Sequence, residues 1–136
     1  MARSLFLFFG LLLLTAAGCQ YESPTHFEER FPLKGGELKF ITPDEHSRNQ
    51  VIKITTDTGN LPMDLCVVPF DMQSKYWEAA RDEFKNGEEP INKLASVFRE
   101  PNPKLSFKVP AKSRVTVMIR NASDRTKEVY LKISGQ

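Results

Sequence analysis

The stretch LSFKVPAKSRVTVMIRNASDRTKEVYLKI, residues 105–133, decides the fold. Apolar and polar residues alternate in three parts of it, 105–109, 115–119 and 129–133. Alternation with a period of two places the apolar side chains on one face of a β-strand. The segments between these parts are rich in proline, asparagine, serine and charged residues, which are typical of hairpin connections. The stretch therefore predicts three consecutive strands that bury one face.

Four further segments upstream have the composition of strands: 37–41, 50–56, 63–70 and 94–98. The run 63–70 is nearly all apolar and contains Cys66, as expected for a central strand. The segment 94–98 also fits a helical turn that starts at Pro90. With the first interpretation, the sequence predicts seven strands.

One segment has the period of a helix instead. Its apolar residues recur every four positions, at Met72, Tyr76, Ala80 and Phe84. This spacing predicts an amphipathic helix over about 72–86, with Asp71 as its N-cap and Gly87 at its end. The helix either closes one end of the protein, or presents Tyr76 and Trp77 as part of a partner-binding surface.

These elements predict a mainly β fold. Seven antiparallel strands in two packed sheets bury the alternating faces, and one helix is inserted after the third strand. The closing pattern over 109–135 resembles the last strands of bacterial immunoglobulin-like and pre-peptidase C-terminal sandwich domains. This resemblance implies a noncatalytic accessory module.

The N-terminal segment MARSLFLFFGLLLLTAAGC, residues 1–19, is typical of an export signal. Arg3 precedes an apolar run from Leu5 to Leu14, and small residues follow up to Cys19. The ten residues of the run are far fewer than the ~20 that a membrane-spanning helix needs. We therefore expect export rather than a permanent transmembrane helix.

The sequence Ala16-Ala17-Gly18-Cys19 resembles the lipobox of bacterial lipoproteins, although Ala16 stands where leucine is more usual. The resemblance implies that the Cys19 sulfur carries a diacylglyceryl group, that the chain is cut just before it, and that lipid holds the protein at a membrane. Gln20 points to the outer membrane if the organism is Gram-negative. The expected organisation is a signal peptide over 1–18, a lipidated cysteine and tether over 19–36, and a β-sandwich domain over 37–136.

An ordinary secretory signal, cut near Ala17 or Gly18, remains the alternative. Cys19 and Cys66, the two cysteines of the chain, would then be available to form a disulfide bond in an exported protein. In the lipoprotein interpretation Cys66 is simply a buried thiol.

Composition excludes several classes of function. Cleavage before Cys19 leaves 118 residues (136 − 18) with 18 basic and 17 acidic side chains, a net charge of +1. No block of basic residues points to nucleic acid. The two histidines, His26 and His46, both precede Cys66, which is the wrong order for a cupredoxin-type copper site. The acidic and amide residues Asp57, Asn60 and Asp64 lack the spacing of an EF-hand and fit turns instead.

We therefore expect no catalytic residues, no metal and no cofactor. The leading hypothesis is a nonenzymatic envelope lipoprotein, a lipid-tethered β-sandwich that binds another protein or an envelope polymer. The second hypothesis is a small secreted domain that binds a ligand or a metal, with Cys19 and Cys66 bridged. An enzyme is the third class.

Overall fold

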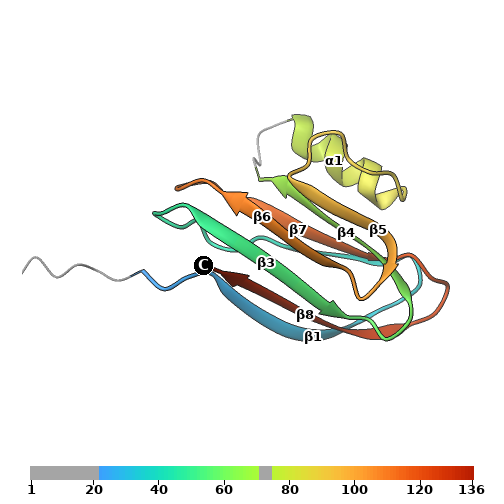
Figure 1. Ribbon diagram of the computed structural model, residues 1–136. Coiled ribbons are helices and arrows are strands. Elements are labelled where there is room, and N and C mark those ends of the chain that lie inside the picture. The colour runs from blue at the N-terminus through green and yellow to red at the C-terminus, as the bar shows by residue number, and fades with distance from the viewer. Residues whose placement is uncertain (1–21, 71–74) are drawn as a thin grey trace, which may run out of the picture.

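The computed structural model describes residues 22–70 and 75–136. Two antiparallel sheets of four strands pack face to face as a β-sandwich, and one helix lies outside them (Figure 1). The strand orders are β1-β8-β3-β6 and β2-β7-β4-β5. The elements are β1 (His26–Leu33), β2 (Leu38–Ile41), β3 (Gln50–Asp57), β4 (Pro62–Pro69), α1 (Lys75–Lys85), β5 (Ala95–Pro101), β6 (Lys104–Val109), β7 (Val115–Asn121) and β8 (Lys127–Gly135).

The alternation in residues 105–133 is confirmed as the pattern that builds the core. Val117 of β7 and Leu131 of β8 are fully buried between the sheets, together with Ile54 of β3. The polar residues between them face outward, as Lys53 and Lys132 do. The two-sheet antiparallel fold predicted from the sequence is therefore correct.

The predicted number of strands is wrong by one, because β1 lies in the segment assigned to the tether. β1 pairs with β8 from His26 opposite Ser134 to Leu33 opposite Lys127. Phe31 and Leu33 are buried in the core. The sandwich thus begins before residue 37, and the helix follows the fourth strand rather than the third.

The segment predicted as strand over 94–98 is strand from Ala95 onward, and the alternative of a helical turn from Pro90 is wrong. Strand β5 pairs with β4, with Val97 opposite Leu65. Leu94 starts this pairing, because its amide N–H donates to the Val67 carbonyl oxygen at 2.7 Å.

Helix α1 confirms the predicted amphipathic segment over 75–85. The predicted start at Met72 and the N-cap Asp71 lie outside the described residues. At the other end, Gly87 has φ +78°. The Gly87 N–H donates to the Phe84 carbonyl at 3.0 Å, and the Glu88 N–H donates to the Glu83 carbonyl at 2.8 Å. This pair of bonds is a Schellman motif, which satisfies the last carbonyls of the helix.

The helix packs on the outer face of the β2-β7-β4-β5 sheet. There the side chains of Ala80 and Phe84 form a second apolar cluster with Cys66, Val68 and Met118. The β1-β8-β3-β6 sheet therefore lies on the opposite side of the molecule from the helix (Figure 1). In the described part of the chain, no helix has the length and apolar character needed to cross a membrane.

Candidate partner-binding surface

Tyr76 and Trp77 are neighbours on α1, but their side chains have different environments. Tyr76 is 70% exposed. Trp77 is half-buried, and its ring makes T-shaped contacts with the rings of Phe40 and Phe70 at centroid distances of 6.0 and 5.5 Å. Edge-to-face contacts of this kind stabilise packing. Trp77 therefore helps to attach the helix to the sandwich, whereas Tyr76 is displayed on the surface.

A second exposed apolar residue, Ile91, lines the same groove as Tyr76. It is 83% exposed, the largest fraction among the exposed large apolar residues of 22–70 and 75–136. The groove has a volume of about 390 Å³ and is lined by Tyr76, Ala79, Ala80, Glu83, Ile91 and Asn92. We call Tyr76, Ala79 and Ile91 the helix–loop surface.

The loop that carries Ile91 is fixed to the helix. The Ile91 N–H donates to a carboxylate oxygen of Glu83 at 3.1 Å. Lys93 forms an ion pair with Glu89 at 3.2 Å, and its ammonium group also donates to the Pro90 carbonyl at 3.3 Å. Pro90 itself is buried. Sequence reasoning missed Ile91, whose only signal is a lone large apolar residue in the polar segment 86–93.

The strands beneath this loop contain a buried ion pair. Asp64 is fully buried on β4, and Arg120 of β7 donates to it from Nε at 3.0 Å. The Arg99 N–H, at a residue with φ +54°, donates to the other carboxylate oxygen at 2.9 Å. Asp57 lies in the other sheet, and its carboxylate accepts the Gly59 N–H at 3.0 Å. The structure thus does not bring Asp57 and Asp64 together.

The thiol of Cys66 is fully buried in the cluster under α1 and is free. Burial raises its pKa from 9.0 to about 12. Because the thiolate is the reactive form, this environment does not suit a nucleophile. Cys19 lies outside the described residues, so its lipidation and its pairing with Cys66 stay predictions.

The two histidines contact different residues and do not form a shared site. His26 Nε2 lies 3.7 Å from Glu28. His46 Nδ1 accepts the Arg48 N–H at 3.2 Å and is 3.9 Å from the Glu22 carboxylate. Within residues 22–70 and 75–136, no group of three or more His, Cys, Asp or Glu side chains is placed to hold a metal ion.

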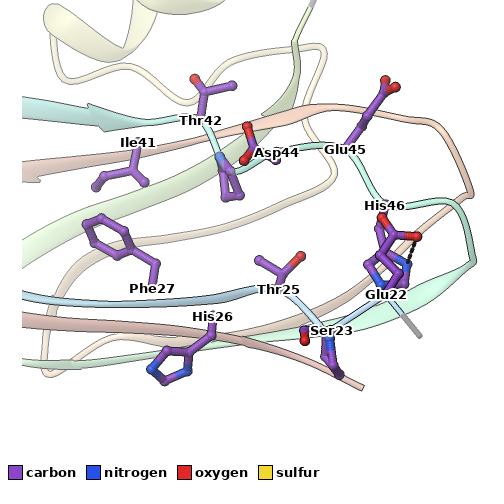
Figure 2. A pocket seen from close by; sticks show the side chains of 12 residues that line it. Glu22, Ser23, Thr25, His26, Phe27, Ile41, Thr42, Asp44, Glu45 and His46 are labelled. Carbon is purple, nitrogen blue, oxygen red and sulfur yellow. Dashed lines mark ion pairs between the residues drawn. The ribbon is translucent and has the colours of Figure 1, made fainter. Parts of the chain in front are cut away.

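A pocket of about 490 Å³ lies at the end of the sandwich where the chain enters, between residues 22–27 and 41–46 (Figure 2). Hydrogen bonds hold the entering chain here. The Glu22 carboxylate accepts the Ser47 N–H at 2.9 Å. Thr25 exchanges two hydrogen bonds with the Gln50 side chain, at 3.0 and 3.1 Å. The chain is therefore fastened to the sandwich from Glu22 onward, and we call this the tether end.

Comparisons with known proteins identify the fold. No family model matches the chain, and no curated protein matches it in sequence. The structure is similar to that of the Yersinia pseudotuberculosis-derived mitogen, with a TM-score of 0.57, 14% identity, and 82% of this chain and 86% of that chain covered. It is also similar to PliG of Aeromonas hydrophila, a periplasmic inhibitor of g-type lysozyme, with a TM-score of 0.53, 14% identity, and coverage of 83% and 88%. The chain thus shares its β-sandwich fold with a mitogen and with a periplasmic lysozyme inhibitor.

Proposed function

We propose that this protein is an exported, nonenzymatic binding protein, held at a membrane by lipid on Cys19, which binds another protein through the helix–loop surface. The observation that carries the proposal is the exposed side chain of Ile91, whose backbone is hydrogen-bonded to Glu83 of α1, in a groove that Tyr76 also lines. Isolated apolar residues are common on surfaces, but here two of them flank a groove on a fixed loop and helix.

The arrangement suits a protein partner for an energetic reason. Because hydrogen bonds already fix the loop, binding loses little conformational entropy there. Burying a large aliphatic side chain such as Ile91 contributes roughly 1.5–3 kcal/mol. Tyrosine is among the residues that most often dominate protein interfaces. Ile91 and Tyr76 are therefore the expected contributors to affinity.

The shared fold supports this class of function. PliG is described as a periplasmic inhibitor of a lysozyme, so a sandwich of this shape acts on another protein in the cell envelope. The other protein with this fold is described as a mitogen. We infer by analogy that this chain also acts by binding.

The burial of Cys66 favours the lipid anchor over the disulfide alternative. A bridge to Cys19 would require the Cys66 thiol to leave the cluster beneath α1, where its exposure is 0%. Lipid on Cys19 leaves the Cys66 thiol in its buried position.

The anchor is tested in the native host with radiolabelled palmitate. We expect the wild-type protein and a Cys66→Ala variant to incorporate label and to fractionate with membranes. We expect Cys19→Ser to incorporate none and to leave the membrane fraction. Membrane retention of Cys19→Ser without label would contradict the anchor.

The partner surface is tested by photo-crosslinking in the same cells. A photoreactive amino acid at Asn92, which lines the groove, should give a discrete crosslinked species. The same amino acid at Ser106, on the other sheet, is the matched control and should not give that species. Ile91→Ser should abolish the Asn92 product. An undiminished product in the Ile91→Ser background would show that this surface is not the binding site.

A further inference from the structure

The outward face of the β1-β8-β3-β6 sheet carries four lysines on three adjacent strands. Strand register places them close together: Lys104 and Lys132 are both paired with Thr55, one on each side. Lys53 is the next outward residue of β3, and Lys108 is paired with Val51 on the same strand. Since strands are about 4.8 Å apart and rise about 3.3 Å per residue, the four Cα atoms fall within about 16 Å of one another. We call Lys53, Lys104, Lys108 and Lys132 the lysine face.

Positive charge is in excess on the lysine face. None of the four ammonium groups lies within 4.0 Å of a carboxylate in the ion pairs of the described residues. Glu28 is paired in register with Lys132, and its carboxylate, which also accepts a hydrogen bond from the Tyr130 hydroxyl, offsets part of the charge of that lysine. Clustered charges of one sign create a local potential that attracts ligands of the opposite sign. The lysine face therefore suits an anionic partner.

The residues between the lysines are small. Thr55, Ser106 and Ser134 occupy the positions beside Lys53 and between Lys104 and Lys132. Their side chains are shorter than those of the lysines, and no wall of larger groups separates the lysines along these rows of the sheet. Such a surface fits an extended anionic plane better than a small ligand, which would need a concave site.

The lysine face also lies toward the tether end. His26 and Lys53 are both paired with Ser134, so the first residue of β1 and Lys53 share one row of the sheet. Cys19 precedes Glu22 by three residues, and Glu22 is already fastened to Ser47. Three extended residues span at most about 11 Å. A lipid on Cys19 would therefore hold the tether end directly against the membrane surface.

We propose that the lysine face docks on the anionic headgroups of the membrane in which Cys19 is anchored. The proposal rests on the proposed lipid anchor for its location. A basic patch strengthens binding when it is combined with a lipid chain. In this orientation the β1-β8-β3-β6 sheet lies on the bilayer, and α1 on the opposite side faces away from it (Figure 1). Tyr76 and Ile91 then remain accessible to a protein partner.

The test uses the mature chain, residues 19–136 with Cys19→Ser, which contains every described strand and the helix but takes no lipid. Co-sedimentation is measured with vesicles of 30% phosphatidylglycerol in phosphatidylcholine and with vesicles of phosphatidylcholine alone. We expect binding to the anionic vesicles only, weakening as salt increases. Each lysine near an anionic surface contributes up to about fivefold in partition.

Two variants with four substitutions each have the same change in net charge. The first converts Lys53, Lys104, Lys108 and Lys132 to glutamine, and the second converts the exposed residues Lys34, Lys75, Lys85 and Lys112 to glutamine. We expect the first to lose at least tenfold in partition to anionic vesicles, and the second to lose less than threefold. Replacing the first four with arginine should restore binding, and thermal unfolding confirms that each variant is folded.

Three outcomes would overturn the proposal: no preference for anionic vesicles, equal losses in both glutamine variants, or binding to soluble polyphosphate without binding to vesicles. The last would show that the lysine face takes a soluble polyanion. Because the protein tested carries no lipid, none of these outcomes bears on the anchor, which palmitate labelling of Cys19 tests separately.

Discussion

The guanidinium of Arg120 donates to the fully buried carboxylate of Asp64 from two nitrogens, Nε at 3.0 Å and Nη2 at 2.5 Å. The pair joins β4 to β7 on the face that α1 and its following loop cover. A Cβ at Gly87 would approach Arg120 Nη2 to 2.8 Å, so the end of the helix sits directly over the guanidinium. The ion pair therefore supports the segment that leads to Ile91.

Breaking this ion pair should strongly destabilise the protein. Removing one partner leaves the other charge buried without compensation, which costs about 3–5 kcal/mol. We expect Asp64→Asn and Arg120→Met each to lower the free energy of unfolding in urea by an amount of this order. The double variant Asp64→Leu/Arg120→Met should lose much less than the sum, because no unpaired charge remains. Losses below about 1 kcal/mol in both single variants would contradict the role assigned to the pair.

Alanine substitutions at two glycines separate the energetic effect of a clash with Arg120 from that of backbone strain. Gly36 and Gly87 have φ +75° and +78°, so alanine at either position adopts a left-handed conformation that costs about 1–2 kcal/mol. A Cβ at Gly36 has no neighbour within 4 Å, whereas at Gly87 it would displace the guanidinium from Asp64. We expect Gly87→Ala to be more destabilising than Gly36→Ala by at least about 1 kcal/mol in thermal or urea unfolding. Equal losses would show that Arg120 moves aside freely.

Strand β1 can be tested as a structural element through Phe31. Its side chain is 5% exposed and lies beneath the Lys39 ammonium, 4.0 Å from the ring centroid. We expect Phe31→Ala to lower the free energy of unfolding by about 3–5 kcal/mol. Arg30→Ala, an exposed neighbour on the same strand, should cost no more than about 1 kcal/mol. A tether would tolerate both changes equally, so similar small losses would remove β1 from the fold.

The same strand shows why the sequence predicted seven strands and the structure has eight. In HFEERFPL, the charged residues of 28–30 interrupt the apolar pattern before Phe31 and Leu33. Glu29 occupies a core-side position by alternation, yet β1 is an edge strand and Glu29 reaches Lys39 on β2 in the other sheet, at 3.1 Å. A polar residue is tolerated at this open edge of the sandwich. Residue pattern alone does not reveal which strand is at an edge.

The candidate surface was predicted only in part for a similar reason. Helical periodicity predicts the position of Tyr76 on the helix. It does not predict that Tyr76 is exposed while Trp77 is half-buried. Trp77 is partly buried by contacts with Phe70 and with Phe40, and Phe40 is distant in sequence. The exposure of Ile91 depends on the hydrogen bond of its N–H to Glu83, eight residues earlier. Such tertiary contacts leave no periodic signal in the sequence.

The Cys66 thiol should resist chemical modification in the folded protein. It is fully buried, so a reagent cannot reach it. Burial also raises its pKa to about 12, so little of the reactive thiolate is present at pH 8. In the Cys19→Ser background Cys66 is the sole cysteine. We expect a disulfide-exchange reagent at pH 8 to react with it at least a hundredfold more slowly in buffer than in denaturing urea. Comparable rates in both solutions would place the thiol on the surface.

The same raised pKa makes the stability of the protein depend on pH in the alkaline range. In the unfolded chain the Cys66 thiol ionises near pH 9, whereas in the folded protein burial keeps it protonated up to about pH 12. The folded state therefore holds more protons than the unfolded state between these values, and the free energy of unfolding falls as pH rises through them. One thiol contributes at most about 1.4 kcal/mol per pH unit.

We expect the difference in unfolding free energy between Cys19→Ser and Cys19→Ser/Cys66→Ala to be constant from pH 7 to 8.5 and to decline above pH 9. Tyr130, whose pKa is raised by its hydrogen bond to Glu28, is present in both proteins and cancels in this difference. A difference that stays constant up to pH 10.5 would mean that the thiol ionises as readily in the folded protein as in the unfolded chain.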